Sequence, residues 1–206
     1  MLKFERALPK ARYEGQLVLA SSSPRRQALM REAGYRFEVV TPEVPEDRLR
    51  IREVRALVES LAYAKARQVA DRLETGIVIG ADTVVVHQGE VIGKPSTPGE
   101  ARMILKRLAG TTHEVVTGVC VVNARRGERL LGSDVTRVTM RDFAEEELDT
   151  YVRSGEGLGK AGAYAIQENA DRFIERIEGS FTNVVGMPME LLAVLIDAMA
   201  ELIWEN

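Results

Sequence analysis

The chain has 206 residues, enough for one domain or two closely joined lobes, and its 45% hydrophobic and 29% charged residues are typical of globular proteins. A formal net charge of −3 and only 5% aromatic residues argue against a nucleic-acid binder, which needs a basic excess or stacking platforms. Neither a membrane-spanning run nor a signal-peptide pattern is found, and the single cysteine, Cys120, cannot form an internal disulfide. We therefore expect a cytoplasmic protein whose phosphate ligands, if any, are small and bound in a local pocket.

The first part of the chain predicts alternating strands and helices. Leu17–Ala20 is a short apolar strand, and Ser21–Arg26 predicts a helix start, because serine can cap a helix and proline suits its first turn. This helix is expected to end near Gly34. A second strand is predicted at Phe37–Val40, and apolar residues at helical spacing within 50–73 predict a long helix with one apolar face.

The later part predicts more hairpins. Strand segments are expected on both sides of Ala81-Asp82, and Thr97 with Glu100 forms a capping-box pattern. The predicted elements, in chain order, are strands Ile77–Gly80, Thr83–His87 and Val91–Ile92, a helix from Thr97 to Gly110, paired strands Val115–Val122 and Leu130–Met140, an acidic helix Ala144–Arg153, a strand Phe173–Ile177 and a last helix opened by Pro188. This order predicts an α/β fold with a mixed central sheet flanked by helices.

The Ser21–Arg26 run is the first candidate binding feature. A helix N-terminus exposes unpaired N–H groups and a positive dipole end, and Arg25 and Arg26 add donors that can grip a phosphate. The alternative is a serine cap followed by two solvated arginines. The junction alone does not decide between them.

Three charged residues are further candidates. Asp82 follows an apolar strand, where a carboxylate can hold a metal ion or orient a water molecule, although an isolated aspartate more often occupies a turn. Lys94 in Gly93–Pro95 could face phosphates or lie in a solvated loop, and its surroundings lack the pattern of a Walker A loop. Lys65 lies on the long helix among alanines, so it either points towards the sheet and an anionic partner or reaches solvent as a surface lysine.

A run of small residues, Gly157–Gln167, predicts a close backbone approach and ends in an amide that can both donate and accept. Tight packing of a turn is the alternative. Other chemistries find little support: His87 and His113 lack metal-ligand spacing, Cys120 falls in an apolar strand, and nucleophile-elbow and dinucleotide-binding glycine patterns are missing from the sequence.

Together these motifs resemble one family. The matching segments, in order, are LASSSPRR at Leu19–Arg26, GADT at Gly80–Thr83, GKP at Gly93–Pro95, Gly159–Gln167 and GSFTNVVGMP at Gly179–Pro188. They resemble the Maf family of nucleoside triphosphate pyrophosphatases over roughly residues 16–204. We expect an N-terminal extension, residues 1–15, and one Maf-like domain, residues 16–206.

The resemblance implies two lobes around a cleft, a fold similar to that of inosine-triphosphate pyrophosphatases, and a homodimer. It implies a catalytic, metal-binding Asp82, with Glu46 as a second acidic metal ligand. Lys65 and Lys94 are expected to face the phosphates as catalytic groups. The implied substrate-binding residues are Ser21, Ser23, Arg25, Arg26, Thr83 and Gln167.

The implied reaction is hydrolysis of a nucleoside triphosphate to the monophosphate and pyrophosphate, with Mg or Mn as the divalent metal cofactor. The Ile166-Gln167 ending resembles the dTTP/UTP branch of the family, which is associated with house-cleaning of nucleotides. Glu168 stands where many members have glycine, which leaves CTP, 7-methyl-GTP or modified pyrimidines as alternatives. The other alternative is a non-enzymatic nucleotide-binding regulator of septum formation.

Overall fold

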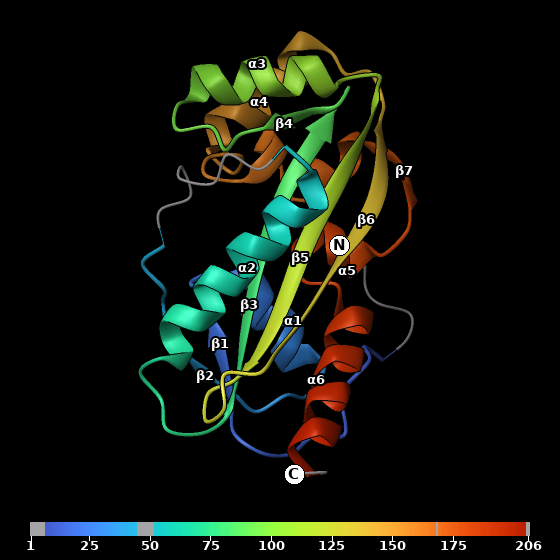
Figure 1. Cartoon of the computed structure of the whole chain (residues 1–206). Helices are drawn as coiled ribbons and strands as arrows, with labels where there is room; N and C mark the ends of the chain where they lie inside the picture. Colours follow the sequence, from blue (N-terminus) through green and yellow to red (C-terminus); the bar gives the residue numbers. More distant parts are fainter. Residues whose placement is uncertain (1–6, 45–51, 168, 205–206) are drawn as a thin grey trace. The chain divides into compact units, whose positions relative to one another are not determined.

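The computed structural model describes residues 7–44, 52–167 and 169–204. Its strands are β1 (Leu17–Ala20), β2 (Glu38–Val39), β3 (Ile77–His87), β4 (Glu90–Ile92), β5 (Thr112–Asn123), β6 (Arg129–Met140) and β7 (Ile174–Glu178). They form one sheet in the order β2-β1-β3-β5-β6-β7, with β4 paired to β3 (Figure 1). β1 is parallel to β2 and β3, whereas β3–β4 and β6–β7 are antiparallel, so the predicted mixed sheet is confirmed.

The helices are α1 (Pro24–Glu32), α2 (Val54–Ala70), α3 (Pro98–Leu108), α4 (Glu145–Ser154), α5 (Phe181–Val185) and α6 (Met189–Trp204), with short 3₁₀ turns η2 (Ala161–Ala163) and η3 (Asn169–Phe173). In Figure 1, α2 lies across one face of the strands β1, β3 and β5, and α1 lies behind them. This arrangement follows from the parallel pairing of β1 with β2 and β3. Parallel strands need crossover connections, and these are usually helices that pack on a face of the sheet.

The chain divides into two compact units. Unit 1 comprises Thr83–Val116 and Val135–Val185. Unit 2 comprises, among the described residues, 7–44, 52–82, Thr117–Asp134 and 186–204. The cleft implied by the resemblance stays a prediction.

The core of unit 2 forms where α2 packs on β1, β3 and β5. Apolar side chains of the helix recur every three or four residues, and Ala62, Ala66 and Val69 are buried against Val18 and Val78. Burying a side chain of the size of valine contributes about 1.5–3 kcal/mol relative to exposure. This packing fixes the position of α2, which carries Lys65 on the same buried side.

One local prediction needs correction. Ile77–Gly80 and Thr83–His87 are not separate segments, because β3 continues through Ala81 and Asp82, both of which are buried. The predicted cap of α3 is present: Thr97 accepts from the Glu100 N–H at 3.2 Å, and the Glu100 carboxylate accepts from the Thr97 backbone and from the N–H and hydroxyl of Ser96.

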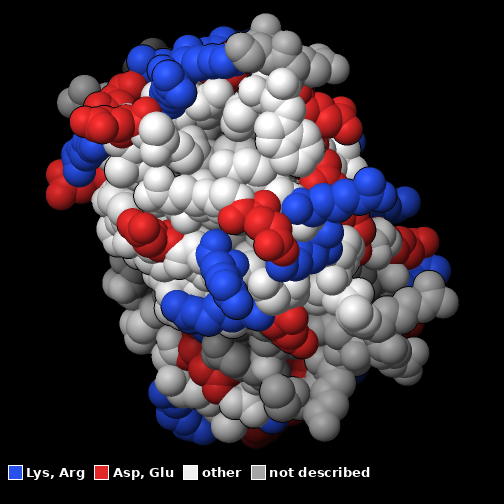
Figure 2. Space-filling model, turned by 90° about the horizontal axis from the view of Figure 1, so that it is seen from below, with Lys and Arg blue, Asp and Glu red and all other residues white. Residues whose placement is uncertain are grey.

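Figure 2 shows one face of the molecule, on which basic and acidic side chains are interspersed. Charges of opposite sign largely lie beside each other there. Among the described residues, no helix combines the length and apolar character needed to cross a membrane.

Candidate active site

Lys65 and Asp82 form a buried ion pair in unit 2. The Lys65 ammonium donates to Oδ1 of Asp82 at 2.6 Å, and the two side chains are 11% and 5% exposed. The surface alternative for Lys65 is therefore wrong, and so is the turn alternative for Asp82, which lies within β3. A carboxylate and an ammonium this deeply buried are stable only as partners, because either alone would be strongly penalised.

Gly80 makes this pairing possible. A Cβ atom at this position would lie 2.2 Å from the backbone oxygen of Ala62 and 2.8 Å from the nitrogen of Ala66. Only glycine allows α2 to approach β3 so closely. The close approach puts the Lys65 side chain, one turn along the helix from Ala62, within reach of Asp82.

The Ser21–Arg26 junction lies at the same edge of the sheet. The parallel pairing of β1 with β3 ends at Ala20 and Gly80, so Ser21 and Asp82 both follow the paired segments. Ser21 is buried, and its Oγ accepts from the Ser23 N–H and from Nη1 of Arg26, both at 3.2 Å. The carboxyl ends of parallel strands are where α/β proteins bind ligands.

Arg26 is held by a second bond, from Nε to the carbonyl oxygen of Gly186 at 2.8 Å. The arginine therefore joins the first sequence motif to the last, and it is not simply solvated. Ser23 occupies the N-cap position of α1 without a side-chain cap bond among the described residues, whereas the Ser21 hydroxyl bonds the Ser23 N–H. Ser23 and Arg25 are half-buried in the same turn. The first turn of α1 contains no acidic residue, which suits an incoming anion.

Unit 1 carries the other predicted residues. Thr83 directly follows Asp82 on β3, Lys94 is exposed after β4, and Gln167 is half-buried. The Gly159 N–H donates to the carbonyl oxygen of Pro95 at 2.9 Å, so the loop that ends in Gln167 is bonded to the Gly93–Pro95 segment. The two motifs are thus neighbours in space.

The last motif, Gly179–Pro188, received no role from sequence reasoning, and the structure supplies one. Asn183 is fully buried, and its Nδ2 donates to the Val115 carbonyl at 3.0 Å and to Thr136 Oγ1 at 2.9 Å. Thr136 also exchanges two bonds with the backbone of Ser180. These bonds fasten α5 to β5 and β6. The polar residues of the motif were the available signal, but their partners are distant in sequence.

Glu46, the second expected metal ligand, lies outside the described residues. Within the described part of the chain, no group of three or more His, Cys, Asp or Glu side chains is placed to hold a metal ion. Of the two expected metal ligands, Asp82 is the one that lies among the described residues. A single buried carboxylate is compatible with Mg, which is commonly bound by one or two carboxylates together with substrate phosphates.

A buried carboxylate–lysine pair beside an arginine-bearing helix start in an α/β sheet fits the class of enzymes that act on phosphate compounds. The chain belongs to the Maf family, because the family model described as "Maf-like protein" matches residues 16–199. The predicted family is confirmed.

Three similar proteins share the name dTTP/UTP pyrophosphatase. A dTTP/UTP pyrophosphatase of Symbiobacterium thermophilum is 47% identical over 174 residues, which cover 84% of this chain and 89% of the relative. That of Pelotomaculum thermopropionicum is 45% identical, with 88% and 95% covered, and that of a Geobacillus species is 44% identical, with 84% and 92% covered.

Proposed function

We propose that this protein hydrolyses dTTP and UTP to the nucleoside monophosphates and pyrophosphate. It is a nucleoside triphosphate pyrophosphatase of the Maf family, and the family match together with relatives of the same name supports this reaction. The structural observation that carries the proposal is the buried Lys65–Asp82 pair at the edge of the sheet where the Ser21–Arg26 junction also lies. It combines a carboxylate able to take a proton with cationic groups for phosphates.

In this reaction Asp82 orients the attacking water and accepts its proton through a carboxylate oxygen. Lys65, which donates to Oδ1, holds that carboxylate in place within the buried site. The N–H groups of the first turn of α1, with the guanidinium of Arg26, bind phosphate oxygens. Lys94 adds a positive charge for the departing pyrophosphate, so catalysis is largely positioning and electrostatics.

A divalent cation, Mg or Mn, is part of the proposal. Asp82 and Glu46 would hold it, and it would supply charge neutralisation at the phosphates and a lowered pKa for bound water. The carboxylate chemistry of Asp82 suits such hard cations.

Gln167 is proposed to read the base. Uracil and thymine present an N3–H donor beside the O4 acceptor, and one side-chain amide can answer both. Arg25 and Thr83 are proposed to flank the nucleotide as further specificity residues. The proposal also includes a cytoplasmic location, which cell fractionation would test, and a homodimer, which size-exclusion chromatography with light scattering would test.

The test is a panel of UTP, dTTP, CTP, ATP and 7-methyl-GTP with Mg or Mn, assayed for pyrophosphate release. We expect UTP and dTTP to be preferred. Gln167→Ala should lower kcat/KM for these two about tenfold or more, because an unmatched buried polar group costs about 1–3 kcal/mol, while ATP turnover changes little. Gln167→Glu should be worse for UTP, since a carboxylate repels O4. Failure of every substrate would instead favour a nucleotide-binding regulator.

A further inference from the structure

The two histidines of the chain are buried in unit 1 and are not used by the proposed reaction. His113 on β5 is 2% exposed and His87 at the end of β3 is 4% exposed. The Nε2 of His113 shares a hydrogen bond with the Tyr164 hydroxyl at 2.8 Å, and the rings meet edge to face with centroids 5.5 Å apart. Tyr164 itself is 5% exposed.

A catalytic role for His113 does not fit these surroundings. Burial, with a smaller effect of the nearby His87, lowers its pKa to about 4, so its imidazole is neutral at physiological pH. One of its nitrogens is occupied by Tyr164, and both the ring and its partner lie away from solvent. The pair therefore acts within the protein interior.

Tyr164 belongs to the loop that ends in Gln167. Residues 162–166 are all buried, so the backbone before Gln167 has little freedom to move as a surface loop would. Gly162 and Ala163 have φ angles of 71° and 61°. For alanine this left-handed conformation costs on the order of 1 kcal/mol, and it persists only where the surroundings determine the backbone.

A second tyrosine holds the same loop. The Tyr151 hydroxyl on α4 accepts from the Ala165 N–H at 3.3 Å, and Tyr151 packs edge to face on Phe173 with centroids 5.5 Å apart. The Tyr151 hydroxyl thus holds Ala165, and the hydroxyl of the preceding residue, Tyr164, bonds His113 on β5. Such ties replace the ladder of backbone bonds that a helix or strand would provide.

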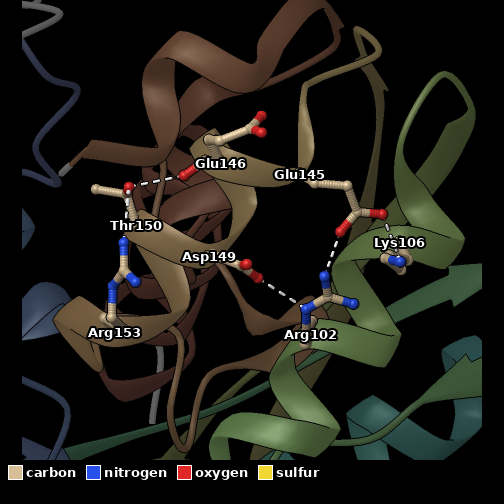
Figure 3. A network of polar contacts seen from close by, with 7 residues as sticks. All are labelled: Arg102, Lys106, Glu145, Glu146, Asp149, Thr150 and Arg153. Atoms are coloured by element: carbon tan, nitrogen blue, oxygen red, sulfur yellow. Dashed lines mark hydrogen bonds and ion pairs between the residues drawn. The ribbon is translucent and has the colours of Figure 1, made fainter.

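Helix α4 is in turn attached to α3 by a polar network. Nε of Arg102 donates to Asp149 at 2.8 Å, and Arg102 and Lys106 both pair with Glu145 (Figure 3). On the other side of α4, Arg153 and Thr150 bond within the helix. Individual surface pairs of this kind contribute little, but the shared carboxylate and guanidinium link α4, the helix that carries Tyr151, to α3.

We propose that the Tyr164–His113 hydrogen bond, supported by Tyr151, is a positioning device that sets the orientation of Gln167 and so the base selectivity of the enzyme. The inference rests on the proposed function, in which Gln167 reads the base. Tyr164 and His113 are positioning residues and do not contact the substrate. Loss of the tyrosine hydroxyl leaves a buried imidazole nitrogen without its partner, which loosens the segment immediately before Gln167.

The test compares kcat and KM for UTP and CTP in Tyr164→Phe, which removes one oxygen and keeps the ring. We expect the UTP-to-CTP ratio of kcat/KM to fall about tenfold, mainly through a higher KM for UTP, with kcat nearly kept because the phosphate contacts are unchanged. Tyr151→Phe should shift the ratio in the same direction. His113→Gln, whose amide can still bond the hydroxyl, should retain most of the selectivity, whereas His113→Leu should lose it as Tyr164→Phe does.

Tyr35→Phe is the matched control. Tyr35 is also 5% exposed, and its hydroxyl accepts from the Ala11 N–H at 2.7 Å in unit 2. It should lower the melting temperature without moving the UTP-to-CTP ratio. If Tyr164→Phe lowers the melting temperature similarly and leaves the ratio within twofold, the pair is only structural and the inference is overturned.

If Tyr164→Phe does not fold, His113→Gln and His113→Leu are compared instead, and equal UTP-to-CTP ratios of kcat/KM in these two variants would overturn the inference. Gln167→Ala is measured in the same assay. An unchanged UTP-to-CTP ratio in Gln167→Ala would refute base reading by Gln167. A changed ratio in Gln167→Ala, together with a wild-type ratio in Tyr164→Phe, would refute only the positioning role.

Discussion

The buried Lys65–Asp82 pair should show strong energetic coupling in a double-mutant cycle. At 2.6 Å the Coulomb attraction is about 6 kcal/mol at an effective dielectric constant of ~20, most of which offsets the loss of hydration of both ions. Lys65→Met leaves the carboxylate buried without its cation and should destabilise the protein by about 3 kcal/mol or more. Asp82→Asn leaves the ammonium facing a neutral amide and should also be destabilising.

The double variant Lys65→Met/Asp82→Asn buries no unpaired charge, so its loss should be smaller than the sum of the single losses by about 2 kcal/mol. Urea unfolding followed by far-UV circular dichroism measures all four proteins. Tryptophan fluorescence is a poor probe, because the single tryptophan, Trp204, is 71% exposed at the end of α6.

Arg67 and Asp71 provide a matched control. Their nitrogen and oxygen atoms are also 2.6 Å apart, but the side chains are 46% and 53% exposed. The cycle Arg67→Met/Asp71→Asn should give additive losses, since water screens exposed pairs. Additive losses at Lys65 and Asp82 as well would show that burial does not couple the site pair, and the reasoning would be wrong.

Asp82→Asn should fold and lose about 10²–10⁴-fold in kcat, the range for a catalytic acid or base; a rate near that of the wild type with saturating metal would remove Asp82 from catalysis. Lys94→Ala and Arg26→Ala should each lower kcat/KM about tenfold for UTP and CTP alike, because phosphate contacts carry no base information. A loss that differs between UTP and CTP would place the substituted residue at the base. Because the pKa of His113 is lowered from 6.5 to about 4 by burial and by His87, the unfolded chain binds one more proton in this window. Stability should therefore be full above pH 6.5 and fall by up to ~1.4 kcal/mol per pH unit on acidification towards pH 4, and urea titrations of His113→Gln should show most of this slope removed.

Local patterns predicted the elements of this fold well because their signals are short in range. The cap at Thr97 and the helix that begins after Pro188 both depend on neighbouring residues, and the structure contains each of them. The strand β2 spans only Glu38–Val39 and is shorter than the predicted Phe37–Val40, although the Val40 N–H still donates to the Leu19 carbonyl of β1 at 3.1 Å.

The features that local patterns predicted wrongly, or did not predict, depend on contacts between residues that are distant in sequence. A carboxylate within a strand is unfavourable by propensity, so a break at Asp82 was the natural prediction, but Lys65 from another element compensates the buried charge. Similarly, Tyr164 and His113 are 51 residues apart, and no spacing rule joins them. The residues of the site were recognisable from motifs, whereas the bonds that position them required the tertiary structure.

The burial of Cys120 allows unfolding to be followed by alkylation of its thiol. This single cysteine is fully buried in β5 among Ala62 and Val122 of the unit 2 core, and burial raises the pKa of its thiol to about 12. In the native state the thiolate that alkylating reagents require is therefore both scarce and inaccessible. The rate of labelling should track opening of this core, so slower labelling in the presence of a nucleotide would measure binding without any turnover.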